Sequence, residues 1–438
     1  MLQTSRPCPE RMWRTLTREL KNSGVEWIGI MPLLWEVVPS NMLFYNSSIK
    51  TEEGVQQLTA SQKYGVISQN RFMQLETQTP VQKQNLNDLK KVSKGDFVIS
   101  LRSFQGGIEI AQESGGITPA YTVLKERTSK TYDGYYKYLF KSEMYIQALR
   151  GTVLDTIRDG KAIRFSNFSM VPIILPPKDE QEEIALFLDD IVKKINMVVS
   201  ETQQSIEDLN RYKNSLVSEI VTRGLNKNIE MKNSGVKWIG DVPIDWEMKM
   251  IGNFFSQVKD KNVDLTESNL LSLSYGNIVR RDINSSDGLL PENFSGYNIV
   301  QPSDIVLRMT DLQNDQKSLR TGLVTEKGII TSAYITTRNN NPNLVNSEYI
   351  RYLLHTFDIQ KGFYGMGSGV RQNITYKDIK KLPIVVPPIE IQSQIVKFLS
   401  EKLTAVNDLV KEKGNIISEL EQYKKSLIYE YITGKKEV

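Results

Sequence analysis

The chain has 438 residues, a formal net charge of +4, 39% hydrophobic residues, one cysteine (Cys8) and one histidine (His355). The length predicts more than one domain, and the mildly basic charge is compatible with nucleic-acid binding without indicating it. One cysteine excludes an internal disulfide, and one histidine argues against a histidine-based metal site or a Ser-His-Asp triad. We expect a cytoplasmic chain, because the sequence has neither a signal-peptide core nor an apolar run of about 18 residues.

The first globular segment follows residues 1–21, which we expect to be an N-terminal extension. It covers residues 22–175 and opens with "NSGVEWIGIMPLLWEVVP" (22–39). Short β-type runs such as "DFVIS" and "YTVL" alternate there with loops rich in Gly, Asn and Ser, which predicts a mixed α+β domain with small sheets. Pro172, Pro176 and Pro177 end this domain and stop its last strand before a helix.

Residues 176–227 predict a long helix. Apolar side chains recur there with spacings that alternate between four and three, which is typical of a heptad seam. The positions are Ile184, Leu188, Ile191, Ile195, Val198, Leu209, Tyr212 and Leu216. An isolated helix with such a stripe needs a partner, and Gly224 is a reasonable end for it.

The rest of the chain repeats this plan 211 positions later. "NSGVKWIGDVPIDWEM" (233–248) opens a second domain over residues 228–386, and residues 387–438 form a second helix with a matching seam that includes Leu409, Ile416 and Tyr423. Four of the five tryptophans lie in the two openings. The sequence therefore predicts a tandem duplication with pseudo-two-fold symmetry, in which the two helices form an antiparallel coiled coil. The alternative is that each helix packs only on its own domain.

The middles of the two halves differ more than their ends, which favours two readers of different half-sites on DNA. Arg, Gln and Asn in loops are the side chains that contact base edges and phosphates, although any single surface arginine is more often a solvated side chain. The candidates are Arg102, Ser103, Gln105, Arg158, Lys161 and Arg164 in the first half, and Tyr275, Arg280, Arg281, Arg308, Arg371, Gln372 and Asn373 in the second.

No motif predicts chemistry on this chain. "GMGSGV" (365–370) does not lie between a strand and its helix as a nucleotide-binding loop would, and the first half has no equivalent glycines. There is no Walker A motif and no Asn/Asp-Pro-Pro-Tyr/Phe tetrapeptide of an amino-methyltransferase. We therefore expect no catalytic residue, no metal site and no cofactor on the chain itself.

The repeated openings, the joints "VPIILPPKDEQEEI" (171–184) and "LPIVVPPIEIQSQI" (382–395), and the heptad helices resemble the specificity (S) subunits of type I restriction-modification enzymes. The resemblance covers nearly all of the chain after residue 22. It implies two target recognition domains that read a bipartite DNA sequence, with helices that set the unread spacer. It also implies two methyltransferase subunits and restriction/translocase subunits as partners, which bind S-adenosylmethionine, ATP and Mg²⁺.

Two other functions remain open from the sequence. The chain could be a scaffold that organises partner proteins without reading bases, or a fused restriction enzyme with its own catalysis. We expect the tryptophan-containing openings to be structural in either case, because residues that read different half-sites should differ between the halves.

Overall fold

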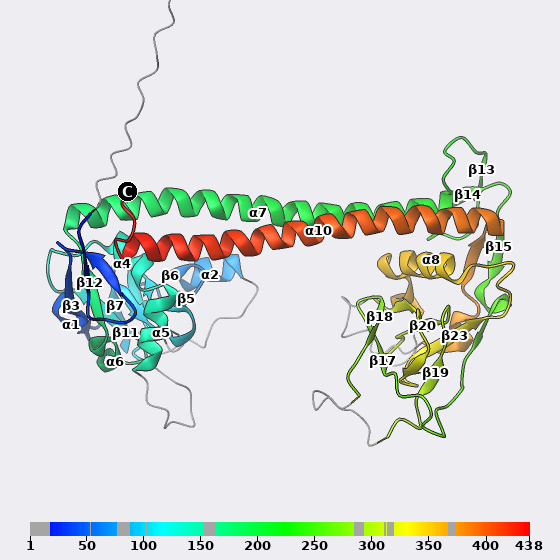
Figure 1. Ribbon diagram of the computed structural model, residues 1–438, viewed down its shortest axis with the longest axis horizontal. Coiled ribbons are helices and arrows are strands. Elements are labelled where there is room, and N and C mark those ends of the chain that lie inside the picture. The colour runs from blue at the N-terminus through cyan, green and yellow to red at the C-terminus, as the bar shows by residue number, and fades with distance from the viewer. Residues whose placement is uncertain are drawn as a thin grey trace, which may run out of the picture. The chain divides into compact units, whose positions relative to one another are not determined.

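Two compact units make up the chain. The computed structural model describes residues 18–52, 54–76, 88–100, 103–152, 163–283, 293–310, 312, 319–366 and 374–438. Unit 1 combines the described part of Met1–Glu201 with Ile416–Val438, and unit 2 is Thr202–Asn415. Each unit contains one globular domain and parts of both long helices, α7 (Lys178–Arg223) and α10 (Ile389–Ile432), which are labelled in Figure 1.

The globular part of unit 1 is built on a four-stranded antiparallel sheet with the order β4-β11-β8-β9. These strands are β4 (Phe44–Ser47), β11 (Thr122–Glu126), β8 (Phe97–Ile99) and β9 (Glu109–Ile110). Four two-stranded antiparallel pairs surround the sheet: β1 (Leu20–Asn22) with β2 (Ile30–Pro32), β3 (Glu36–Pro39) with β12 (Pro172–Leu175), β5 (Leu58–Ser61) with β6 (Gly65–Ser68), and β7 (Lys90–Val92) with β10 (Gly115–Ile117).

Short helices complete unit 1 and close its core. They are α1 (Ser40–Leu43), α2 (Gln69–Leu75), α3 (Ser103–Gly106), α4 (Asp133–Leu139), α5 (Glu143–Gly151) and α6 (Phe165–Met170). Phe44, on the edge strand β4, lies edge-on to Phe97, Tyr136 and Phe140, with ring centroids 5.8, 5.2 and 5.6 Å away. Aromatic pairs prefer this edge-to-face packing, so one aromatic cluster joins the sheet to α4.

The globular part of unit 2 repeats this plan with the sheet order β16-β23-β20-β21. These strands are β16 (Phe255–Gln257), β23 (Ile335–Asn339), β20 (Ile305–Leu307) and β21 (Thr321–Leu323). The two-stranded pairs are β13 (Met231–Asn233) with β14 (Asp241–Pro243), β15 (Glu247–Met250) with β24 (Pro383–Val386), β17 (Leu271–Ser274) with β18 (Asn277–Arg280), and β19 (Asn298–Val300) with β22 (Gly328–Ile330). The predicted tandem duplication of α+β domains is thereby confirmed.

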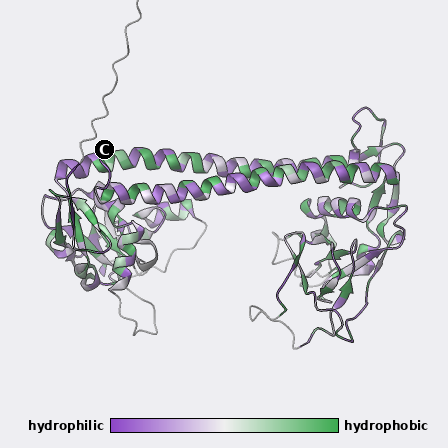
Figure 2. Ribbon diagram, viewed as in Figure 1, coloured by the Kyte–Doolittle hydropathy of each residue, from purple (hydrophilic) through white to green (hydrophobic). Residues whose placement is uncertain are grey.

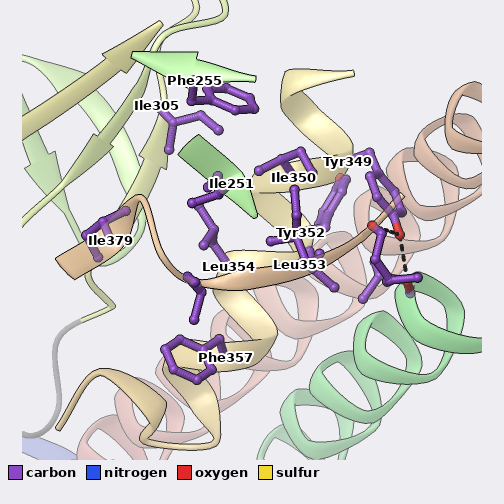
Figure 3. Packing of buried hydrophobic residues seen from close by; sticks show 14 of the residues in the cluster. Ile251, Phe255, Ile305, Tyr349, Ile350, Tyr352, Leu353, Leu354, Phe357 and Ile379 are labelled. Atoms are coloured by element: carbon purple, nitrogen blue, oxygen red, sulfur yellow. Dashed lines mark hydrogen bonds between the residues drawn. The ribbon is translucent and has the colours of Figure 1, made fainter. Parts of the chain in front are cut away.

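The main helix of this second domain is α8 (Ser347–Ile359). Three shorter helical elements accompany it: α9 (Tyr376–Ile379) and the 3-10 turns η2 (Ile251–Asn253) and η3 (Gly362–Gly365). The Asn346 side chain caps α8 by accepting hydrogen bonds from the backbone N–H groups of Glu348 and Tyr349 at 2.9 and 3.2 Å. Ile350, Leu353, Leu354 and Phe357 follow at helical spacing, so α8 buries one apolar face in the core that Figure 3 shows.

The two long helices run antiparallel within each unit. In unit 1 the rings of Phe187 and Tyr431 lie 4.6 Å apart, and Lys424 Nζ donates a hydrogen bond to Asn196 Oδ1 at 2.9 Å. In unit 2 Lys213 Nζ donates to Asn407 Oδ1 at 3.2 Å. The predicted antiparallel pairing is confirmed, and Figure 2 shows hydrophobic and hydrophilic residues mixed along both helices.

Each globular domain packs against the start of its own helix and the end of the other helix. The core of unit 1 includes Leu188 near the start of α7 and Ile432 at the end of α10. The core of unit 2 includes Leu399 near the start of α10 and Val221 near the end of α7. The alternative in which each helix packs only on its own domain is therefore wrong.

The predicted heptad seam is wrong at several of its positions, whereas its residues Leu209 and Leu216 are half-buried. Val198 and Tyr212 of α7 are 44% and 53% exposed, and Leu409 and Tyr423, which stand 211 positions later, are 46% and 53% exposed. Polar hydrogen bonds from Lys213 and Lys424 join the helices close to these positions instead. The apolar residues at these four positions consequently face solvent.

The repeated tryptophans hold the ends of the long helices, which confirms their structural role. Trp35 is fully buried, and its indole N–H donates to Glu180 Oε2 at 2.8 Å near the start of α7. Gly434, just beyond α10, has a positive φ of 67°, and a Cβ placed there would lie 2.9 Å from Trp35 Cη2. Gly224, just beyond α7, has the same relation to Trp246, with 3.0 Å to Cζ2.

The glutamine of each Pro-Pro-x-x-x-Gln joint is a fully buried connector. In unit 1 the Gln181 side chain accepts from Tyr132 N at 2.8 Å and donates to Pro176 O and Lys130 O at 2.8 and 3.0 Å. Gln392 makes the same three bonds in unit 2, with Asn346 N, Pro387 O and Leu344 O at 2.8, 2.7 and 3.0 Å. A buried amide needs partners for both of its polar groups. In each unit the glutamine therefore ties the start of the long helix to the Pro-Pro segment before it and to a loop of the globular domain.

Tyrosine hydroxyl groups also hold this joint together. The hydroxyl of Tyr349 on α8 lies 2.9 Å from Val221 O and 3.2 Å from Val385 O, and these two hydrogen bonds are the dashed lines in Figure 3. In unit 1 two neighbouring residues divide the task, because Tyr136 donates to Ile174 O at 3.0 Å and Tyr135 donates to Ile432 O at 2.5 Å. Both domains thus fasten the last strand and the incoming helix end to one internal helix.

Candidate DNA interface

Each globular domain carries one β-hairpin packed beside the outer strand of its four-stranded sheet. In unit 2 the hairpin β17–β18 turns through Tyr275 and Gly276, since Ser274 pairs with Asn277. In unit 1 the hairpin β5–β6 turns through Gln62, Lys63 and Tyr64, since Ser61 pairs with Gly65. Tyr64-Gly65 and Tyr275-Gly276, which lie 211 positions apart in the sequence, are therefore at corresponding hairpin tips.

The hairpin of unit 2 is fixed at its turn. Gly276 has φ +81°, and a Cβ placed there would lie 3.2 Å from Leu319 Cβ and 3.5 Å from Thr321 O, at the start of β21. Tyr275 also has a positive φ, of 45°. Two consecutive residues with positive φ are the pattern of a type I′ turn, which matches the twist of a two-residue hairpin.

Three of the predicted contact residues share this hairpin. Tyr275 is 72% exposed at its tip, and Arg280 and Arg281 are exposed at its other end. The Arg280 guanidinium binds the Glu326 carboxylate in a fork, with Nε 2.7 and 2.9 Å from the two oxygens, and this contact raises the pKa of Arg280 and lowers that of Glu326. The hairpin therefore presents an aromatic ring and two cations along one exposed ribbon.

Arg308 lies close to the tip of the same hairpin. It follows β20, is half-buried, and its backbone N–H donates to Arg320 O at 2.9 Å, next to the residues that contact Gly276. The structure thus brings Tyr275 and Arg308 to one end of the ribbon and Arg280 with Arg281 to the other. Arg371, Gln372 and Asn373 lie outside the described residues.

The hairpin of unit 1 is more enclosed. All four residues of β6 are buried, and α2 follows directly after it. The Tyr64 hydroxyl donates to Glu76 Oε1 at 3.1 Å, and Lys63 lies over the Tyr64 ring at 4.8 Å. Arg71 on α2 is paired with Glu113 at 2.9 Å. The aromatic ring at this tip is therefore held by its own domain.

The predicted contact residues of the first half differ in their exposure to solvent. Ser103 is buried, and its hydroxyl accepts from the backbone N–H of Ser100 at 2.8 Å, so this side chain serves the turn and is not available on the surface. Arg164 is exposed at the start of α6, where its backbone N–H donates to Asn167 Oδ1 at 3.0 Å. Gln105 belongs to α3 but its side chain lies outside the described part, as do residues Arg102, Arg158 and Lys161 entirely.

Two buried charged groups near the hairpin tips were missed by the sequence reasoning. In unit 1 Glu109 is 1% exposed and paired with Lys141, whose Nζ also donates to Gln62 O in the hairpin loop at 3.3 Å. Burial raises the pKa of Glu109, and Lys141 opposes that shift. In unit 2 the fully buried Arg320 donates to the carbonyls of Arg308 and Thr310 at 3.1 and 3.0 Å. No sequence pattern distinguishes these charges from exposed ones.

A second ion pair, partly buried, recurs in both domains and links neighbouring strands of the sheet. Asp304 accepts from the Arg338 guanidinium at 2.8 Å through both oxygens, and Asp96 pairs with Lys125 at 2.5 Å at the corresponding place. Each aspartate also accepts a backbone N–H three residues earlier, from Gln301 and Ser93. Features that recur in this way belong to the common frame, whereas the hairpin surfaces differ.

Within the described residues there is no group of three or more His, Cys, Asp or Glu side chains placed to hold a metal ion. None of the described helices is long and apolar enough to cross a membrane. His355 is half-buried on α8, and desolvation lowers its pKa to about 4, with help from the neighbouring cations Arg351 and Lys213. The one imidazole is thus neutral near pH 7.

Known proteins match both halves of the chain. The family model of the type I restriction modification DNA specificity domain matches residues 36–208 and 243–422. A putative type I restriction enzyme MjaX specificity subunit from Methanocaldococcus jannaschii is 25% identical over 285 residues, which cover 63% of this chain and 61% of that relative. The type I restriction enzyme MjaVIII specificity subunit of the same organism is 24% identical over 359 residues, covering 78% of this chain and 80% of the relative.

The fold is also found among solved structures. One of them, from work on complex assembly and conformational transition of the type I R-M system, matches with a TM-score of 0.65 at 13% identity. It covers 93% of this chain and 99% of its own length. At this identity the match shows that the fold is shared.

Proposed function

This chain belongs to the family defined by the type I restriction modification DNA specificity domain, and from that premise we propose that it is the DNA-specificity subunit of a type I restriction-modification complex. Each globular domain reads one half of a bipartite DNA target, and the helices set the spacer between the half-sites. The chain itself is not an enzyme. Adenine methylation and DNA cleavage belong to partner subunits in the cytoplasm, which bind S-adenosylmethionine, ATP and Mg²⁺.

The observation that carries the proposal is the contrast between the repeated frame and the two hairpins. Buried connectors recur 211 positions apart, as Gln181 and Gln392 do, with the same hydrogen bonds. The hairpin tips differ, since Tyr64 is held by Glu76 whereas Tyr275 is exposed. Two domains on one frame with different exposed loops are suited to two different sequences, because base readout depends on side chains at the surface.

The DNA contacts that we propose are the exposed groups of the candidate interface. They are Tyr275, Arg280, Arg281 and Arg308 in the second domain and Arg164 in the first, together with Arg102, Gln105, Arg158, Lys161, Arg371, Gln372 and Asn373, which stay sequence-based predictions. Ser103 is left out because it is buried. Arginines that bind phosphates release counterions, so the affinity for DNA should fall steeply with salt.

The proposed docking surfaces for two methyltransferase subunits are the exposed apolar residues in the middle of the helices. Unit 1 exposes Val198 and Tyr423, and unit 2 exposes the equivalent Leu409 and Tyr212. Each pair flanks one of the two equivalent hydrogen bonds, Lys424 to Asn196 or Lys213 to Asn407. Two copies of one arrangement suit two copies of one partner, and apolar side chains that are exposed in equivalent places on both units are the groups that such a partner would cover.

A segment exchange tests the recognition function. Residues 64–165 are replaced by the corresponding segment of another specificity subunit, the full chain is produced with its methyltransferase partner, and methylated adenines are mapped by long-read sequencing against a deletion strain. One half of the methylated motif should change while the other half and the frame of the site persist. An unchanged motif would leave only the scaffold function. Methyl transfer by the isolated chain would instead indicate a fused enzyme.

A charge substitution tests the docking surfaces. Tyr212→Glu and Tyr423→Glu should each remove one methyltransferase subunit from the complex, as measured by the mass of the purified assembly, and the double variant should remove both. Leu186→Glu is the matched control, because Leu186 is 65% exposed on α7 but its counterpart 211 positions later is Lys397. If the control disrupts assembly as strongly as the tyrosine variants, the patches are not the docking sites.

A further inference from the structure

Tyr275 combines high exposure with a backbone conformation that tyrosine rarely adopts. It is 72% exposed at the tip of β17–β18, and its φ is +45°. An L-residue with a side chain is strained in this left-handed region, where glycine or asparagine is preferred. Among the described residues no ring contact, cation–π contact or side-chain hydrogen bond is recorded for Tyr275. Nothing in the fold of unit 2 therefore accounts for a tyrosine at this position.

The corresponding tyrosine of the first domain has an ordinary structural explanation. Tyr64 is partly buried, its hydroxyl donates to Glu76, and its ring lies beneath Lys63. Its backbone is outside the left-handed region, which is occupied there by Gly65 alone, with φ +73°. The two tyrosines share a sequence step but not a role, so the exposure of Tyr275 is a property of the second domain alone.

The hairpin that carries Tyr275 is tightly packed on the face that it turns toward β21. Leu271 and Leu273 of β17 are buried, and a Cβ on Gly322 of β21 would lie 2.6 Å from Leu273 Cδ1 and 2.9 Å from Ile278 Cδ1. Such close packing fixes the hairpin on β21 and leaves the ring directed away from the core. The same ribbon carries Arg281 exposed at its far end, a cation suited to phosphates, beside Arg280, whose guanidinium is paired with Glu326.

We propose that Tyr275 makes the aromatic base contact of the second recognition domain: its ring packs against base edges in a groove of the DNA half-site that this domain reads, and Tyr64 makes no such contact in the first domain. This inference rests on the proposed function, since it assigns a residue within that DNA interface. A ring held out at an exposed hairpin tip is available to a groove of the duplex, where apolar contacts with base edges contribute to sequence readout.

The test uses the complex of the full chain with its methyltransferase partner and a duplex that carries the methylated motif of the host genome. Tyr275→Ala should weaken binding by roughly 5- to 150-fold, the range that loss of one base contact in a duplex site produces. Tyr275→Phe, which keeps the ring, should bind within about twofold of wild type. Tyr64→Ala is the matched control, and it should leave the affinity within about threefold because that ring is held by its own domain.

A glycine variant separates binding from folding. Tyr275→Gly removes the ring and also relieves the positive φ, so it should weaken DNA binding as much as Tyr275→Ala while the unfolding temperature stays equal or rises. If Tyr275 had a packing role, the same variant would lower the unfolding temperature, and that result would overturn the inference.

The remaining outcomes are equally distinct. Wild-type affinity and motif in Tyr275→Ala would overturn the inference and leave the proposed function standing, because the complex would still select its site. Loss of the methyltransferase subunit from Tyr275→Ala, with no change in DNA affinity for the complex that remains, would make the ring a protein contact and overturn it too. Failure of the wild-type complex to distinguish the motif from unrelated DNA would refute the proposed function, and the inference with it.

Discussion

Lys213 on α7 donates a hydrogen bond to Asn407 on α10 at 3.2 Å, and this bond is made a second time in the other unit. Its counterpart joins Lys424 to Asn196 at 2.9 Å, with both residues displaced by 211 positions and the helices exchanged. An internal two-fold relation requires that every such contact occur in two copies. The pair is therefore direct evidence, at the level of single atoms, for the pseudo-symmetry of the duplicated chain.

The two copies should contribute independently to stability. Lys213→Met should lower the free energy of unfolding by about 0.5–1 kcal/mol, because its bond is exposed to solvent, and Lys424→Met should lower it by at least as much, because Lys424 also pairs with Glu421 at 2.7 Å. The double variant should show the sum, since the sites lie in different units and share no partner. Urea unfolding of the four proteins measures this. A coupling larger than about 0.5 kcal/mol would argue against independent sites.

The buried glutamines should be far more costly to remove. Gln392→Ala leaves Asn346 N–H and two carbonyls without their partners inside unit 2, and we expect a loss of about 2–4 kcal/mol in the free energy of unfolding. Gln181→Ala should behave alike in unit 1. Gln204→Ala on the exposed face of α7 is the control and should change stability by less than about 0.5 kcal/mol. Equal effects at all three positions would mean that the joint does not depend on its amide.

Alanine substitution should change stability in opposite directions at two glycines, one inside α10 and one just beyond its end. Gly414 lies in the interior of α10 with nothing within 4 Å of a new Cβ, so Gly414→Ala should stabilise by up to about 1 kcal/mol. Gly434 has φ +67° and closely contacts Trp35, so Gly434→Ala should destabilise by about 1–3 kcal/mol. Thermal unfolding compares the variants. Stabilisation by both substitutions would contradict the close packing of Gly434 against Pro32 and Trp35.

His355 should make the protein less stable as the pH falls below neutrality. Its folded-state pKa is about 4, below the ordinary value of 6.5, so the unfolded chain binds a proton at a higher pH than the folded chain does. This contribution is fully present above about pH 6.5 and is lost between about pH 6.5 and 4, with a size of up to about 3 kcal/mol. Because the chain has only one histidine, His355→Gln removes all imidazole titration. The stability difference between wild type and variant should therefore change across this window, and a constant difference would show that burial does not hold His355 neutral.

The arrangement of the chain was readable from the sequence because it rests on periodicity and repetition. A displacement of 211 positions aligned both openings, both Pro-Pro joints and both helices, and apolar spacing predicted the helices now seen as α7 and α10. The structural nature of Trp35 and Trp246 also followed, since residues that serve two different half-sites should not be identical. These inferences depend on local pattern and on comparison of the chain with itself.

Only the tertiary structure decided which side chains are exposed. Ser103 and Tyr275 were equal candidates in the sequence, but one is buried in a turn and the other projects from a hairpin tip. Tyr212 and Tyr423 fit a heptad seam, but polar contacts between the helices turn them toward solvent. Exposure depends on contacts between segments far apart in the chain, as with Glu109 and Lys141 or Arg320 and Tyr364, and no local pattern specifies such contacts. The sequence by itself determined that there are two reading domains on a repeated frame, and the packing decided which residues those domains present.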